Sequence, residues 1–145
     1  MAKDIFTDQE QQQIREAIQE AELNTSGEVK VHIENLCKED TMDRAAFIFE
    51  KLEMHKTELR NGVLIYLALK DRKFAILGDI GINQKVPEGF WNSTSELMLN
   101  SFKSGDFLNG LIKGVKEAGL QLKAHFPYQK DDKNELSDDI SFGKN

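Results

Sequence analysis

The sequence predicts an α/β protein: a three-layer α/β/α sandwich around a small, mixed, roughly four-stranded central sheet. Three observations lead to this prediction. Segments with helical periodicity stand before, between and after segments that have the pattern of strands, and one of those strands is apolar throughout. No linker or internal repeat divides the 145 residues. We therefore expect one domain over residues 1–127, followed by an acidic tail over residues 128–145.

The first half of the chain contains two predicted helices and one predicted strand. Thr7 stands three residues before Glu10 in a capping-box pattern, and apolar residues then recur at helical spacing. The segment EVKVHIE, residues 28–34, alternates polar and apolar side chains, which predicts a strand with one solvent-exposed face. A second helix is expected within residues 39–54, with Thr41 as its cap.

The second half contains two further strands and two helices. Residues 61–69, NGVLIYLAL, have the composition of a central strand covered on both faces. The link to residues 73–79 is too short for a crossover, so these two strands should form an antiparallel hairpin. Helices are expected over residues 90–102 and 105–126, the second capped by Asp106.

The composition excludes several classes of function. The formal net charge is −6 and the basic residues are scattered among acids, which argues against nucleic-acid binding. The longest apolar run is far shorter than the roughly 20 residues of a membrane span, and the N-terminal residues lack the apolar stretch of a secretion signal. The single Cys37 cannot form an internal disulfide. We therefore expect a soluble, cytoplasmic domain without membrane insertion.

Familiar catalytic motifs are missing from the sequence. There is no G-x-S-x-G nucleophile elbow, no phosphate-binding G-x-x-x-x-G-K-[ST] loop and no G-x-G-x-x-G dinucleotide turn. His32, His55 and His125 are too dispersed for a zinc motif. Catalytic residues therefore remain unassigned, and carboxylates are the candidates for binding chemistry.

Topology brings three carboxylates to one edge of the predicted sheet. If the first two strands run parallel and the third runs opposite, then Glu28, Glu58 and Asp79 lie in neighbouring loops. Oxygen ligands of this kind suit Ca²⁺ or Mg²⁺, and glycines around Asp79 would let backbone carbonyls turn inward. Each residue also has a structural alternative: Asp79 as a turn residue, Glu28 as the exposed partner of Lys30, and Glu58 as a solvent-exposed residue.

The C-terminal tail offers further oxygen ligands. Its composition suits a segment that becomes ordered when a cation bridges it to the domain, although it lacks the pattern of an EF-hand. The alternative is a solvated acidic tail. The tail residues that we add to the predicted metal site are Asp131, Asp132, Asn134, Glu135 and Asp138.

A rival cluster lies at the opposite edge of the predicted sheet. It combines Asp40, Thr41 and Asp43 with Asp71 from the hairpin turn. Open α/β sheets usually bind ligands at the carboxyl ends of their parallel strands, which is this edge. Acids are also expected at a helix start for capping reasons, so we rank this cluster second.

The order of the segments SGEVKVHIE, AAFIFEKLEM, RNGVLIYLALKDRKFAILGDIGI and SFKSGDFLNGLIKGVKEAGLQL resembles the TPM domain family over about residues 24–125. The resemblance implies an α/β/α sandwich with about four strands, the fourth near Val86 or in the DISF segment of the tail. Plant members of the family are associated with acid phosphatase activity, calcium and photosystem II repair. Glu28 matches an acidic position of the family, whereas Asp79 lies where many members have only glycine and a hydrophobic residue.

Three functional hypotheses follow. The first is a regulatory or accessory module that binds Ca²⁺ or Mg²⁺ and offers a surface to a protein partner. The second is a metal-assisted phosphatase, in which Arg60 or Lys56 would contact phosphate. The third is an interaction domain without metal.

Overall fold

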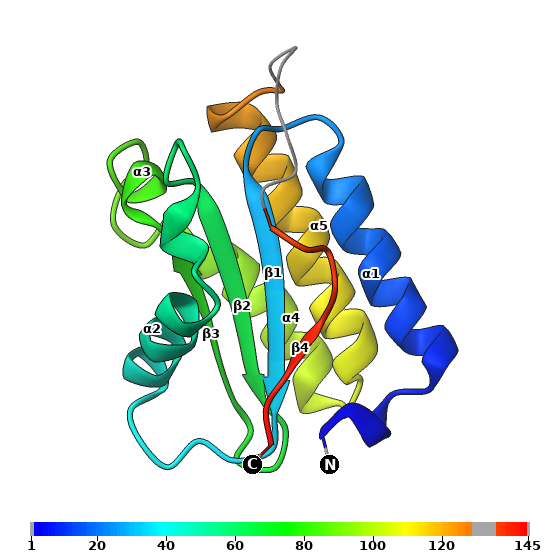
Figure 1. Cartoon of the computed structure of the whole chain (residues 1–145). Helices are drawn as coiled ribbons and strands as arrows, with labels where there is room; N and C mark the ends of the chain where they lie inside the picture. The colour runs from blue at the N-terminus through cyan, green and yellow to red at the C-terminus, as the bar shows by residue number, and fades with distance from the viewer. Residues whose placement is uncertain (1, 129–135, 145) are drawn as a thin grey trace.

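The computed structural model describes residues 2–128 and 136–144, and these form helices on both faces of one four-stranded sheet (Figure 1). The strand order is β3-β2-β1-β4, so β3 and β4 are the two edges. The strands are β1 (Glu28–Glu34), β2 (Gly62–Ala68), β3 (Lys73–Gly78) and β4 (Ser141–Phe142). The predicted α/β architecture with a mixed sheet is confirmed.

The helices divide unequally between the two faces. Helices α1, α4 and α5 pack against one face, and α2 covers the other (Figure 1). The α-helices are α1 (Asp8–Glu22), α2 (Thr41–Lys51), α3 (Ile80–Asn83), α4 (Asn92–Lys103) and α5 (Phe107–His125), with short 3₁₀ helices η1 (Ala2–Ile5) and η2 (Met54–Lys56). As predicted, Thr7 and Glu10 form a capping box at α1 and Asp106 caps α5.

The strand pairing follows the predicted topology. Strands β1 and β2 run parallel, and the short link makes β2 and β3 an antiparallel hairpin. The fourth strand comes from the DISF segment of the tail, where β4 pairs in parallel with β1 and places Ser141 opposite His32. Asp131, Asp132, Asn134 and Glu135 lie outside the described residues.

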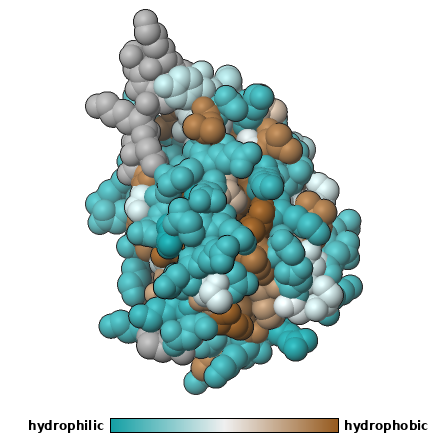
Figure 2. All heavy atoms as spheres, turned by 90° about the vertical axis from the view of Figure 1, so that its right-hand side faces the viewer, coloured by the Kyte–Doolittle hydropathy of each residue, from teal (hydrophilic) through white to brown (hydrophobic). Residues whose placement is uncertain are grey.

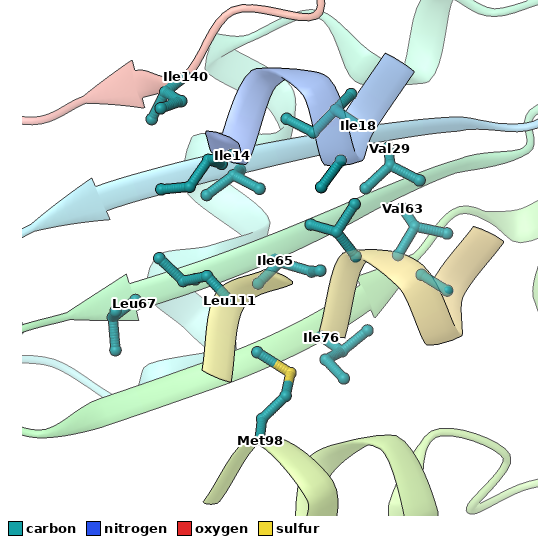
Figure 3. Close-up of a cluster of buried hydrophobic side chains, with 14 of the residues drawn as sticks. Ile14, Ile18, Val29, Val63, Ile65, Leu67, Ile76, Met98, Leu111 and Ile140 are labelled. Carbon is teal, nitrogen blue, oxygen red and sulfur yellow. The ribbon is translucent and has the colours of Figure 1, made fainter. Parts of the chain in front are cut away.

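The larger core lies between the sheet and α1, α4 and α5. All seven residues of β2 are buried, as their continuous apolar pattern predicts. Side chains from both layers meet in this core, where fully burying each aliphatic side chain contributes roughly 1.5–3 kcal/mol (Figure 3). They include Ile14, Ile18, Val63, Ile65, Met98 and Leu111.

The prediction that β1 has one solvent-exposed face is wrong. Glu28, His32 and Glu34 are 2%, 5% and 0% exposed. The tail segment causes part of this burial, because Leu136 packs against the smaller core on the α2 side of the sheet. A row of polar groups is therefore buried between β1 and its cover, where each needs a partner.

Two local predictions also change. Asp40, not Thr41, caps α2, because its carboxylate accepts hydrogen bonds from the backbone N–H groups of Met42 and Asp43. The glycine-bearing segment after β3 forms the single-turn helix α3, with Asp79 as its cap. Asp79 thus lies at the junction of a strand and a helix.

The outer surface is predominantly polar on the α1 side of the molecule. Figure 2 shows this face as mostly hydrophilic, with a narrow strip of hydrophobic atoms. Among the described helices, none combines the length and apolar character needed to span a membrane.

Candidate functional site

Three carboxylates gather where the tail passes the start of β1. Glu22 ends α1, Glu28 begins β1, and Asp138 belongs to the tail. The side chain of Glu22 hydrogen-bonds that of Asp138, and Glu28 is close enough to act electrostatically on Glu22. We call Glu22, Glu28 and Asp138 the carboxylate cluster.

The carboxylate cluster holds a proton. Burial, the hydrogen bond to Asp138 and the nearby charge of Glu28 raise the pKa of Glu22 to about 9, although the Val29 N–H donates to its Oε2 at 2.8 Å. Glu22 is therefore protonated at neutral pH and can donate to the Asp138 carboxylate. Two carboxyl groups that share a proton avoid placing two like charges together.

The tail is fastened to β1 and α1 on either side of Asp138. The Leu136 N–H donates to Glu28 Oε1 at 2.6 Å, and Lys30 Nζ donates to the Ser137 carbonyl at 3.1 Å. Burial lowers the pKa of Lys30. On α1, Arg15 lies 3.5 Å from the carboxylate of Asp139. These contacts place the tail over the polar face of β1.

A second network continues along β1. His32 contacts Ser141 Oγ through Nδ1 at 2.7 Å and Glu34 Oε1 through Nε2 at 3.2 Å. Arg44 donates to both oxygens of Glu34, at 2.8 and 2.9 Å, and the Tyr66 hydroxyl also donates to Glu34. Burial lowers the pKa of His32 against the opposing effect of Glu34, so the ring is kept neutral. This network satisfies a buried carboxylate and joins β4 to the sheet.

Asp79 forms an ion pair with Arg60 at the end of β3. Arg60 Nε and Nη2 donate to the two Asp79 carboxylate oxygens at 2.7 and 2.9 Å, and the Ile80 N–H donates to Oδ1 at 2.8 Å. A cation at Asp79 would have to compete with this bidentate pair. The Asp79 side chain thus caps α3 through the Ile80 N–H and pairs with Arg60, a local role beside the turn that was the alternative to metal binding.

The register keeps Asp79 away from Glu28. Glu28 lies opposite Gly62 on one side of β2, and Asp79 lies opposite the same glycine on the other side. Two strand spacings, about 10 Å, therefore separate the Cα atoms of Glu28 and Asp79. Met54 packs over Gly62, with its Cε 3.4 Å from the position of an added Cβ. The buried Met54 side chain therefore lies over the strand that separates Glu28 from Asp79.

The remaining predicted residues lie apart from the carboxylate cluster or serve local structure. Glu58 is exposed on the surface. The cations proposed for phosphate binding are both in ion pairs, Arg60 with Asp79 and Lys56 with Glu53. In the rival cluster, Asp40 caps α2, and Asp71 accepts a hydrogen bond from the Cys37 N–H at 2.7 Å.

Of the predicted metal ligands, the structure brings together Glu28 and Asp138. Within residues 2–128 and 136–144, no group of three His, Cys, Asp or Glu side chains is arranged to hold a metal ion. Sequence reasoning missed Glu22. Its signal is a carboxylate in the last turn of α1, where the helix dipole disfavours a negative charge.

Comparison with known proteins identifies the family. The family model described as the TPM domain matches residues 2–121, most of the chain. The chain belongs to the TPM domain family. This TPM domain is also similar to the NMR structure of the BA42 protein from the psychrophilic bacterium Bizionia argentinensis, with 46% identity, a TM-score of 0.89 and coverage of 95% of both chains.

More distant structures share the fold of this TPM domain. The N-terminal domain of a P. gingivalis protein is 18% identical with a TM-score of 0.68, and covers 83% of this chain and 78% of that one. The N-terminal domain of the cg2496 protein from Corynebacterium glutamicum is 11% identical with a TM-score of 0.64, covering 81% and 74%. No curated protein matches the chain.

Proposed function

We propose that this TPM domain is an accessory module that binds a divalent cation, Ca²⁺ or Mg²⁺, at the carboxylate cluster. The observation that carries the proposal is the hydrogen bond between Glu22 and Asp138 beside the buried Glu28. Carboxylate oxygens are the ligand type that these ions prefer. An ion at this position takes the place of the shared proton and compensates the negative charge that the proton now reduces.

The ligands come from segments that are distant in the sequence. Glu22 belongs to α1, Glu28 to β1 and Asp138 to the tail. An ion held between Glu22 and Asp138, with further oxygen ligands completing its coordination, fastens the tail to the domain, which is the coupling expected of a regulatory module. At a concentration about 100-fold above its dissociation constant, the ion adds ~2.7 kcal/mol to the free energy of unfolding.

Other oxygen ligands can come from the tail residues that precede Leu136. Asp131, Asp132, Asn134 and Glu135 remain predictions from the sequence. A protein partner also remains a prediction. In this proposal, the partner binds the surface that the tail forms where β4 pairs with β1, and the stability of that surface depends on the ion.

An amide NMR titration of EDTA-treated protein with calcium, then magnesium, tests the proposal. Saturable shifts should centre on Glu22, Val29 and residues 136–139. Saturable shifts confined to residues 78–83 would instead place the ion at Asp79, and the absence of saturable shifts with either ion would contradict metal binding. The Glu58→Gln variant is the control: the same titration should give unchanged shifts, because this substitution removes an exposed carboxylate outside the carboxylate cluster.

A further inference from the structure

A groove of about 610 Å³ follows the outer edge of β3, far along the sheet from the carboxylate cluster. Its floor includes Phe74, Ala75 and Ile76 of β3. One wall is the start of α2, at Thr41 and Met42, and the other is the segment 86–92 that leads into α4. The edge strand therefore lies between two raised walls.

The backbone of β3 offers unused hydrogen-bonding groups to this groove. The Asp79 N–H donates to the Gly62 carbonyl at 3.0 Å, which makes these opposed residues a hydrogen-bonded pair. Such pairs alternate along antiparallel strands. The N–H and C=O groups of Phe74 and Ile76 consequently point away from β2, and no described strand pairs with that side of β3.

The Gly78 carbonyl, the next group on the outer edge of β3, also points away from β2. Asn83 Nδ2 donates to the Gly78 carbonyl at 3.2 Å, so a side chain satisfies the outer edge of β3 at its end. Trp91 lines the same groove, and its buried indole Nε1 has no hydrogen-bond partner within the described ranges.

We propose that the β3 groove binds an extended peptide segment of a partner protein, which adds to the sheet as a strand beside β3. Backbone hydrogen bonds to Phe74 and Ile76 supply affinity, and apolar side chains of the peptide enter the groove. Glu88 is the charged residue among the described residues that line the groove, and the exposed Asp40 and Asp43 flank the α2 wall. This charge favours a segment that carries Lys or Arg beside its apolar residues.

The walls favour a peptide over a second copy of this chain. Two edge strands must approach to about 4.8 Å to pair. A dimer of two β3 edges would also have to accommodate the α2 start and the 86–92 segment of each copy, whereas a single extended chain brings no such elements to the groove. The proposed occupant is therefore an extended segment whose flanking residues carry no helix or strand of their own.

The test uses the full chain and a synthetic peptide, acetyl-Lys-Val-Thr-Val-Thr-Val-Lys-amide. Saturable changes are expected in the Phe74 and Ile76 amide signals and in the fluorescence of Trp91, the single tryptophan. The same peptide with N-methyl groups on its central five residues should bind at least about tenfold more weakly, because it has lost its backbone donors.

Two matched variants test the position of the peptide. Glu88→Lys should weaken binding several-fold, whereas Glu20→Lys makes the same charge change on the exposed face of α1 and should leave it unchanged. No saturable change up to about 1 mM peptide would overturn the proposal. Shifts confined to β4, the other edge strand, would overturn it in favour of peptide binding at that edge. Changes at β3 that depend on protein concentration without peptide would overturn it in favour of self-association.

Discussion

Arg60 and Asp79 form a bidentate ion pair that joins the segment before β2 to the end of β3, with donor–acceptor distances of 2.7 and 2.9 Å. Arg60 has a left-handed backbone conformation, with φ of 52°. Non-glycine residues adopt this conformation at a cost, so the ion pair and the contacts around it hold the turn in place.

We predict that Asp79→Ala lowers the free energy of unfolding more than Asp79→Asn. Both variants lose the ion pair with Arg60, but the alanine variant also loses the cap on α3, worth about 1 kcal/mol. Urea unfolding of the three proteins measures the difference. Equal midpoints for the two variants would show that the Ile80 N–H gains nothing from the Asp79 side chain. The calcium binding that we propose at the carboxylate cluster should be unchanged in both.

Gly81→Ala should destabilise the fold by roughly 1–3 kcal/mol. A Cβ at residue 81 would lie 2.2 Å from the Leu59 carbonyl oxygen and 2.6 Å from that of Arg60, and neither backbone atom can move freely. Helix propensity alone predicts the opposite sign, since alanine is favoured over glycine within a helix such as α3.

Gly62→Ala is the control for this substitution. Its Cβ would meet the flexible Met54 side chain at 3.4 Å, an ordinary contact, so the cost should be smaller. If the Gly81→Ala variant has a higher melting temperature than the unsubstituted protein, the close approach of the Leu59 carbonyl to α3 does not restrict residue 81 to glycine.

The raised pKa of Glu22 predicts a stability that falls as the pH rises from about 5 to about 9. In this window the unfolded chain has released the proton of Glu22, whose ordinary pKa is 4.5, while the folded chain retains it up to about 9. Folding therefore takes up a proton, and the slope from this group is at most about 1.4 kcal/mol per pH unit.

Glu22→Gln removes this titration and keeps the hydrogen-bonding shape. Its free energy of unfolding relative to the unsubstituted protein should increase between pH 6 and pH 9, as measured by urea unfolding. Parallel profiles for the two proteins would contradict a shared proton between Glu22 and Asp138.

Arg44→Met should cost about 3 kcal/mol, because it leaves the fully buried Glu34 carboxylate without its guanidinium partner. Adding Glu34→Leu to that variant should recover part of the loss, since the double substitution removes both charges but leaves the buried Tyr66 hydroxyl and His32 Nε2 without their acceptor. Denaturant unfolding of the single and double variants measures this coupling. A loss below about 0.5 kcal/mol for Arg44→Met would indicate a weak surface ion pair instead.

Local sequence signals predicted much of the fold because they act within a few residues. Thr7 and Glu10 specify a helix start, and the short link before Lys73 leaves a hairpin as the available connection. Strand β4 was harder to assign, since the two residues Ser141 and Phe142 have no periodicity of their own and depend on pairing with β1.

The candidate site was less predictable because its contacts are long-range. The alternating pattern of β1 indicates an exposed face, but the tail, more than 100 residues later, covers Glu28 through the Leu136 N–H. Glu22 joins Glu28 and Asp138 only through the packing of α1 beside β1. The pairing of Asp79 with Arg60 likewise depends on the tertiary approach of two turns.

Calorimetric titration of calcium into EDTA-treated protein at pH 7, in two buffers of different ionisation enthalpy, tests the central claim most directly. If the ion replaces the proton between Glu22 and Asp138, close to one proton should be released for each ion bound. Glu22→Gln should bind more weakly and release none. Calcium binding without proton release, or no binding heat in either buffer, would contradict the account.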